Sequence, residues 1–126
     1  MIYLLDVSTL IALLWDLHVH NERVTRWQNS ASLAVCPLTE LGFLRISTQP
    51  TFGASVRDAR KILRDWKQAK SPKFVPCDID ALAMDEPPTG SKTTDFYLAS
   101  LAARHSMQLA TLDEGIGHKA AFVIPP

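Results

Sequence analysis

Short apolar runs that alternate with helix-like segments constrain the fold of this chain more than any other feature. Strands separated by helices indicate an α/β fold with a central, mainly parallel sheet. Parallel connections cross over with a right-handed sense, so helices are expected on both faces of that sheet. The apolar runs predict strands at residues 2–5, 33–36, 74–77, 107–111 and 121–124.

The segments between these strands carry apolar residues at helical spacing. They predict helices at residues 9–15, 18–29, 37–48, 54–69 and 96–105. We expect Ser8 to cap the first helix and Thr93 or Thr94 to cap the last, because Ser and Thr are favoured at this position. Residues 78–85 predict a helical turn, and the two prolines and the glycine of residues 86–92 predict a loop.

Length and composition set the size and class of the protein. A chain of 126 residues is long enough for one compact domain, and we expect a single domain over residues 1–126. Hydrophobic residues make up 47% and charged residues 21%, which excludes a disordered chain and a coiled coil. The formal net charge is zero, so a polyanionic partner requires a local basic patch.

The apolar run near the N-terminus, residues 7–15, is much shorter than the roughly 20 residues that span a bilayer. No basic segment precedes it, as a signal peptide would require. Cys36 and Cys77 match neither a zinc motif nor a disulfide framework, and we interpret both as ordinary buried cysteines. We therefore expect a cytoplasmic protein without membrane contact.

Four carboxylates lie in segments that the predicted fold brings toward one edge of the sheet. Asp6 and Asp113 follow strands, and ligands of open α/β sheets bind outside the carboxyl ends of strands. Glu40 and Asp95 lie near the starts of helices that can face the same edge. Clustered carboxylates repel one another, and a hard divalent cation such as Mg²⁺ or Mn²⁺ would neutralise them. Such a cation can polarise a phosphodiester and lower the pKa of a bound water, so the pattern predicts metal-assisted hydrolysis.

Each carboxylate, taken singly, also fits a structural role. Asp6 could cap a helix, Glu40 and Asp95 could complement helix dipoles, and Asp113 could start a turn. The coincidence of all four carboxylates at one sheet edge favours a functional site over four separate structural roles.

A basic stretch, residues 57–73, has seven basic and two acidic residues. It is either a track for RNA phosphates or a solvated helix face.

Four segments of the chain carry a resemblance to a known family: LLDVSTLIALL (4–14), CPLTELGFLR (36–45), TDFYLASLA (94–102) and LATLDEG (109–115). In this order they resemble the PIN domain, and specifically the VapC-type ribonuclease toxins of bacterial toxin–antitoxin systems. The resemblance covers nearly the whole chain. It implies a three-layer α/β/α PIN-like fold, a Mg²⁺-dependent endoribonuclease that Mn²⁺ can also support, a homodimer and a cognate VapB-like antitoxin.

The family's acidic site is matched, position by position, by Asp6, Glu40, Asp95 and Asp113. The resemblance implies that Asp6 and Asp95 are the principal metal ligands and that Glu40 binds the metal directly or through water. It implies that Asp113 completes the site or orients the nucleophilic water, with Thr111 as a hydroxyl neighbour. The chain departs from the family where relatives often carry Arg or Lys soon after the last acid.

The chain has Glu114 there, which adds negative charge beside the predicted site and leaves a phosphate clamp at this position open. Arg45 and Lys92, nearer the acidic segments, are alternatives to the basic stretch of residues 57–73 as phosphate contacts. Two other function classes compete with the ribonuclease. A phospho-receiver domain would need an acidic pair near the first strand, where Asp6 stands alone. A non-catalytic PIN-like module that binds RNA or an antitoxin is the remaining alternative, and metal-dependent cleavage separates it from the enzyme.

Overall fold

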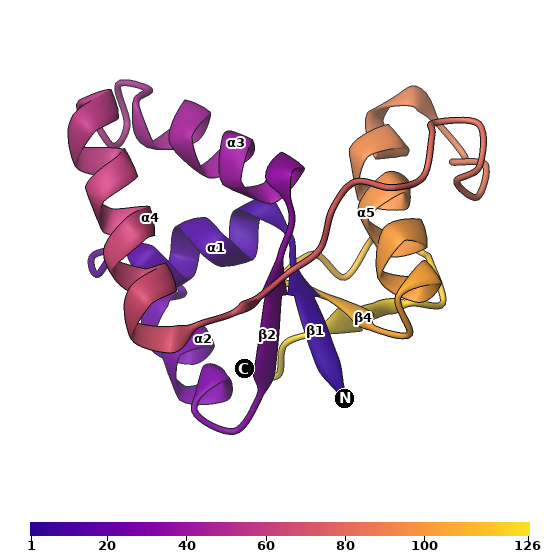
Figure 1. Ribbon diagram of the computed structural model, residues 1–126, viewed down its shortest axis with the longest axis horizontal. Helices are drawn as coiled ribbons and strands as arrows, with labels where there is room; N and C mark the ends of the chain where they lie inside the picture. Colours follow the sequence, from indigo (N-terminus) through magenta and orange to yellow (C-terminus); the bar gives the residue numbers. More distant parts are fainter.

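The computed structural model describes residues 1–126 as a five-stranded parallel sheet with helices on both faces (Figure 1). The order of the strands across the sheet is β3-β2-β1-β4-β5, and every neighbouring pair is parallel. β1 is therefore central. The strands are β1 (Ile2–Leu5), β2 (Ser32–Val35), β3 (Lys73–Phe74), β4 (Gln108–Thr111) and β5 (Ala121–Val123).

The helices form two unequal layers. Figure 1 shows α1–α4 on one side of the sheet and α5 on the other. Successive residues of a strand point to opposite faces, so Leu4 packs in the core under α5 while Leu5 packs in the core under α1–α4. The helices are α1 (Val7–Leu14), α2 (Asn21–Gln28), α3 (Pro37–Ser47), α4 (Val56–Lys70), the short 3₁₀ helix η1 (Gly90–Lys92) and α5 (Thr93–Arg104).

This arrangement confirms the predicted three-layer α/β/α fold with a parallel sheet. The order of the strands, which the sequence pattern left open, places the ends of β1 and β4 side by side. None of the helices is long and apolar enough to cross a membrane.

The strand expected at residues 74–77 ends early. β3 covers only Lys73–Phe74, and one further ladder bond follows, from the Val75 N–H to the Val35 carbonyl oxygen (2.9 Å). Pro76 has no N–H to donate, which stops the ladder. The chain then leaves the sheet, so Cys77 is exposed and its expected burial was wrong, whereas Cys36 is buried as expected.

Two predicted helix starts are also corrected. Asp6, not Ser8, caps α1, because its Oδ1 accepts a hydrogen bond from the Thr9 N–H (2.8 Å). Neither expected threonine caps α5, which begins at Thr93 directly after η1 and has no side-chain cap. α2 begins at Asn21 rather than at residue 18, because the preceding residues form turns.

Helices α1 and α3 approach each other closely at Gly42. A Cβ atom at this position would lie 2.5 Å from a methyl group of Val7, the first residue of α1. Real Cβ contacts are not this short, so a larger residue would push the start of α1 and with it Asp6. Gly42 is therefore required by packing rather than by a turn.

We predict that Gly42→Ala destabilises the protein although Ala is the better helix former. The propensity gain is about 1 kcal/mol, and overpacking a close contact costs about 1–3 kcal/mol, so the net free energy of unfolding falls. Urea denaturation measures it. Gly90→Ala is the control, because no heavy atom lies within 4 Å of a Cβ there. Equal stability of the two variants would contradict the close approach.

Candidate active site

Asp6 links the central strand, the first helix and the neighbouring strand. It is buried, with 5% of its surface exposed, and its side chain caps α1 through Thr9. Its own N–H donates to the Ala110 carbonyl oxygen of β4 (3.2 Å). The Thr9 hydroxyl donates to that same oxygen (3.2 Å). These bonds fix the carboxylate of Asp6 at the shared edge of β1 and β4.

The environment of Asp6 disfavours its charged form. Burial raises the pKa of the Asp6 carboxyl, hydrogen bonds from Thr111 and Thr9 oppose this in part, and the charge of Asp95 adds to the rise. Asp6 takes part in none of the ion pairs of the structure. Its negative charge therefore has no basic partner within the chain.

Asp95 and Asp113 continue the row of carboxylates. Asp95 lies in the first turn of α5, and its pKa is raised by burial and by the charge of Asp113, while Lys92 opposes the rise. Asp113 is half-exposed, and its Oδ1 accepts from the Gly115 N–H (2.7 Å). Lys92 Nζ lies 3.9 Å from Asp113 Oδ2 and donates to the Gly115 carbonyl oxygen (2.7 Å). Asp95 thus interacts electrostatically with both Asp6 and Asp113, and Lys92 lies at the outer end of this row.

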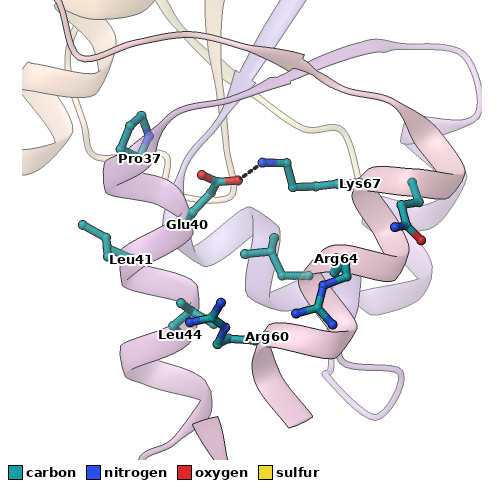
Figure 2. Close-up of a pocket in the computed structure, with 9 residues that line it drawn as sticks. Pro37, Glu40, Leu41, Leu44, Arg60, Arg64 and Lys67 are labelled. Carbon is teal, nitrogen blue, oxygen red and sulfur yellow. Dashed lines mark hydrogen bonds and ion pairs between the residues drawn. The ribbon is translucent and has the colours of Figure 1, made fainter. Parts of the chain in front are cut away.

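Glu40 belongs to a helix that begins at the same edge of the sheet, but its carboxylate is held by a residue of α4. It lies in the first turn of α3, which the Thr39 hydroxyl ties to β1 by donating to the Leu5 carbonyl oxygen (2.7 Å). Its carboxylate forms an ion pair with Lys67 of α4, as Figure 2 shows. The structure therefore places Asp95 within electrostatic reach of both Asp6 and Asp113 and pairs the fourth predicted acid, Glu40, with a lysine.

The donor atoms of this site fit a metal ion in their chemistry, although they do not enclose one. No three His, Cys, Asp or Glu side chains lie together closely enough to enclose an ion. The chemistry of the group nevertheless suits a hard divalent cation, because its donors are carboxylate oxygens and two of them, Asp6 and Asp95, have raised pKa values. Asp6, Asp95 and Asp113 could hold such a cation, and Glu40 could join after leaving Lys67.

Sequence reasoning missed the residues that position these acids. Thr9 and Thr39 occupy matching places, the third residue of the helix that follows a strand, and each hydroxyl donates to a carbonyl oxygen near the end of an adjacent strand. That repeated position was readable from the sequence. The pairing of Lys67 with Glu40 was not, because Lys67 is one of many basic residues on α4.

The basic stretch of residues 57–73 lies mostly on α4. A groove of about 580 Å³ separates α4 from α3, and Arg60, Arg64 and Lys67 line it on the α4 side (Figure 2). Leu41 and Leu44 line it from α3. The groove therefore joins part of the basic surface to Glu40, the acid nearest to α4.

Comparisons with known proteins agree with this fold. The model of the PIN domain matches residues 3–121. Ribonuclease VapC38 of Mycobacterium tuberculosis is 38% identical over 121 residues, which cover 90% of this chain and 86% of that relative. Ribonuclease VapC29 of the same species is 34% identical and covers 99% of this chain and 98% of that relative. The chain belongs to the PIN domain family, in its VapC-type group.

Solved structures share the fold at low sequence identity. FitAB bound to an IR36 DNA fragment has a TM-score of 0.69 at 22% identity, covering 98% of this chain and 93% of that one. VapBC2 from Rickettsia felis, bound to a DNA fragment from its promoter, has a TM-score of 0.61 at 13% identity, covering 98% and 97%. Both likenesses support the three-layer fold.

We predict that Asp6→Asn stabilises the protein at neutral pH in buffer without divalent cations. Asn caps helices as well as Asp does, and it removes a buried charge, so the gain is about 0.5–2 kcal/mol in the free energy of unfolding. Because folding raises the pKa of Asp6 above 3.8, the native state binds this proton more tightly than the unfolded chain. The destabilising effect of Asp6 is therefore complete above the raised pKa and disappears below pH 3.8.

Urea denaturation of both proteins over a series of pH values measures this difference. The gain from Asp6→Asn should shrink as the pH falls through the raised pKa toward 3.8. Asp16→Asn is the matched control, because Asp16 is exposed and belongs to none of the ion pairs. A gain that does not change with pH would show that burial of the Asp6 charge is not its cause.

Proposed function

We propose that this chain is a Mg²⁺-dependent endoribonuclease that acts as the toxin of a VapBC-type toxin–antitoxin pair. The observation that carries the proposal is the row of Asp6, Asp95 and Asp113, in which burial and mutual repulsion raise the pKa values of the first two. Such a row concentrates negative charge at one place, and a divalent cation would neutralise it. The relatives named ribonucleases VapC38 and VapC29 support the same activity.

Each carboxylate has a proposed role in RNA hydrolysis. Mg²⁺, or Mn²⁺ in its place, would supply polarisation of the scissile phosphodiester and a lowered pKa for the attacking water. Asp6 and Asp95 would be its principal ligands, and Glu40 would bind it directly or through water. Asp113 would complete the site or orient the attacking water. The bonds of Asp6 to Thr9 and of its N–H to Ala110 keep its carboxylate in place without a metal.

The proposed partners follow from the same site and from the relatives. RNA is the substrate, and a VapB-like antitoxin would bind the toxin, as the two-component names FitAB and VapBC2 of the structural neighbours suggest for those proteins. We also propose a homodimer. The RNA that is cleaved is not specified by these features, because target choice rests on groove shape and loop contacts.

We predict that Asp95→Asn abolishes RNA cleavage while the protein still folds. The substitution keeps the size of the side chain and removes one of the two principal ligands, so activity should fall by at least about 100-fold. Inducible expression in a bacterial host, with growth followed and RNA 5′ ends mapped, measures this whichever RNA is the target. Growth arrest and discrete new RNA ends are expected with the wild type only.

Asp58→Asn is the control, because Asp58 is an exposed carboxylate on α4 and should leave toxicity intact. Full cleavage by Asp95→Asn would overturn the proposed site. Soluble wild-type protein that causes neither arrest nor new ends would favour the non-catalytic PIN-like module that binds RNA or an antitoxin.

We predict that the double variant Arg57→Glu/Arg64→Glu weakens RNA binding and its salt dependence. The basic stretch of residues 57–73 is the candidate for contacts with the RNA backbone, and loss of two phosphate contacts should reduce the slope of log affinity against log salt by roughly 1.4. Fluorescence anisotropy with a labelled single-stranded RNA of mixed sequence measures it, in the Asp95→Asn background to prevent cleavage.

The control reverses two exposed charges outside the stretch, Arg104→Glu/Lys119→Glu, and changes the net charge by the same amount. If both double variants alter the affinity and the slope equally, or if neither does, the stretch is a solvated helix face and not a phosphate track.

A further inference from the structure

The ion pair between Glu40 and Lys67 crosses from α3 to α4, and both partners are partly removed from solvent. The side chains of Glu40 and Lys67 are 17% and 36% exposed. Lys67 Nζ also lies 5.4 Å above the centre of the Phe74 ring, a cation–π contact that favours the same position of the ammonium group. Lys67 is thus held near Glu40 by two independent interactions.

The other basic residues of α4 are placed differently. Lys61 forms an ion pair with Asp65 (2.6 Å) within the helix, where the two side chains are 67% and 56% exposed and solvent screens the pair. Arg60 lines the groove of Figure 2 together with Lys67, yet it forms none of the ion pairs. Among these cations, Lys67 alone contacts an acid of the candidate active site.

The ion pair between Glu40 and Lys67 affects how a divalent cation can bind Glu40. The first turn of α3 is tied to β1 through Thr39, so the backbone of Glu40 starts beside the row of carboxylates while its side chain is turned to α4. A cation that takes Glu40 as a ligand must displace an ammonium group that already compensates its charge. Because the pair is partly shielded, solvent weakens it less than an exposed pair.

We propose that Lys67 is a positioning residue that holds Glu40 on α4 and competes with the divalent cation for this carboxylate. The proposal rests on the proposed function, because it needs a cation at the row of Asp6, Asp95 and Asp113. Lys67 thereby lowers the affinity of the apo site for the cation.

Isothermal titration of the full chain with Mn²⁺ at constant ionic strength tests the proposal. Lys67→Met should bind Mn²⁺ roughly two- to tenfold more tightly than the wild type, in line with the strength of a partly shielded ion pair. Lys67→Arg keeps the pair and should retain the wild-type affinity. Arg60→Met removes the same charge from the same groove without touching Glu40, and its affinity should stay close to that of the wild type.

The Glu40→Gln background separates competition for the carboxylate from a general effect of charge. There, Lys67→Met should leave the Mn²⁺ affinity unchanged, because the neutral amide is no longer shared between lysine and metal. An equal gain in both backgrounds, or an equal gain from Arg60→Met, would overturn the proposal. Thermal melting checks that each variant folds, and Lys67→Gln replaces Lys67→Met if the methionine variant does not.

Asp95→Asn distinguishes this proposal from the proposed function. If Asp95→Asn weakens Mn²⁺ binding and Lys67→Met does not strengthen it, the metal site stands and the role of Lys67 is overturned. If Asp95→Asn leaves Mn²⁺ binding unchanged, the proposed metal site fails and the role of Lys67 fails with it.

Discussion

Asp6 holds the end of the central strand, the start of α1 and the edge of β4 in one place, through its buried carboxylate and its backbone N–H. A serine or asparagine could cap α1 equally well and would avoid the cost of burying a charge. The raised pKa of Asp6 reflects the free-energy cost of burying its charge. No lysine or arginine forms an ion pair with Asp6 that would offset this cost. A charged cap at this position makes physical sense when a cation compensates the charge in the working protein.

The acids come from both layers of helices, and the two sides are fixed in different ways. On the side of α1 and α3, the hydroxyls of Thr9 and Thr39 lock each first turn to an adjacent strand. On the other side, Asp95 enters with α5 after the short helix η1, and Asp113 sits in a turn closed by its own bond to Gly115. One half of the site is therefore tied directly to the sheet, and the other half depends on loop geometry.

Much of this could be predicted from local sequence patterns. The alternation of strands and helices placed Asp6 and Asp113 at the ends of β1 and β4, and these ends are neighbours in the sheet. Local rules failed where two acceptable residues competed, as when Asp6 rather than Ser8 became the cap, and where Pro76 ended β3. The ion pair of Glu40 with Lys67 could not be predicted, because it depends on how α3 packs against α4 rather than on spacing.

The two lysines near the site divide the four acids into an outer and an inner pair. Lys67 compensates Glu40 at one end, and Lys92 lies beside Asp113 at the other. The inner acids, Asp6 and Asp95, carry the raised pKa values and form none of the ion pairs. Lys92 offsets the charge of Asp95 only in part and no basic residue pairs with Asp6, so a divalent cation would compensate the most charge at this inner pair. Glu40 and Asp113, which contact Lys67 and Lys92, would complete the set of residues that hold the cation, so the two lysines would influence the affinity of the proposed site.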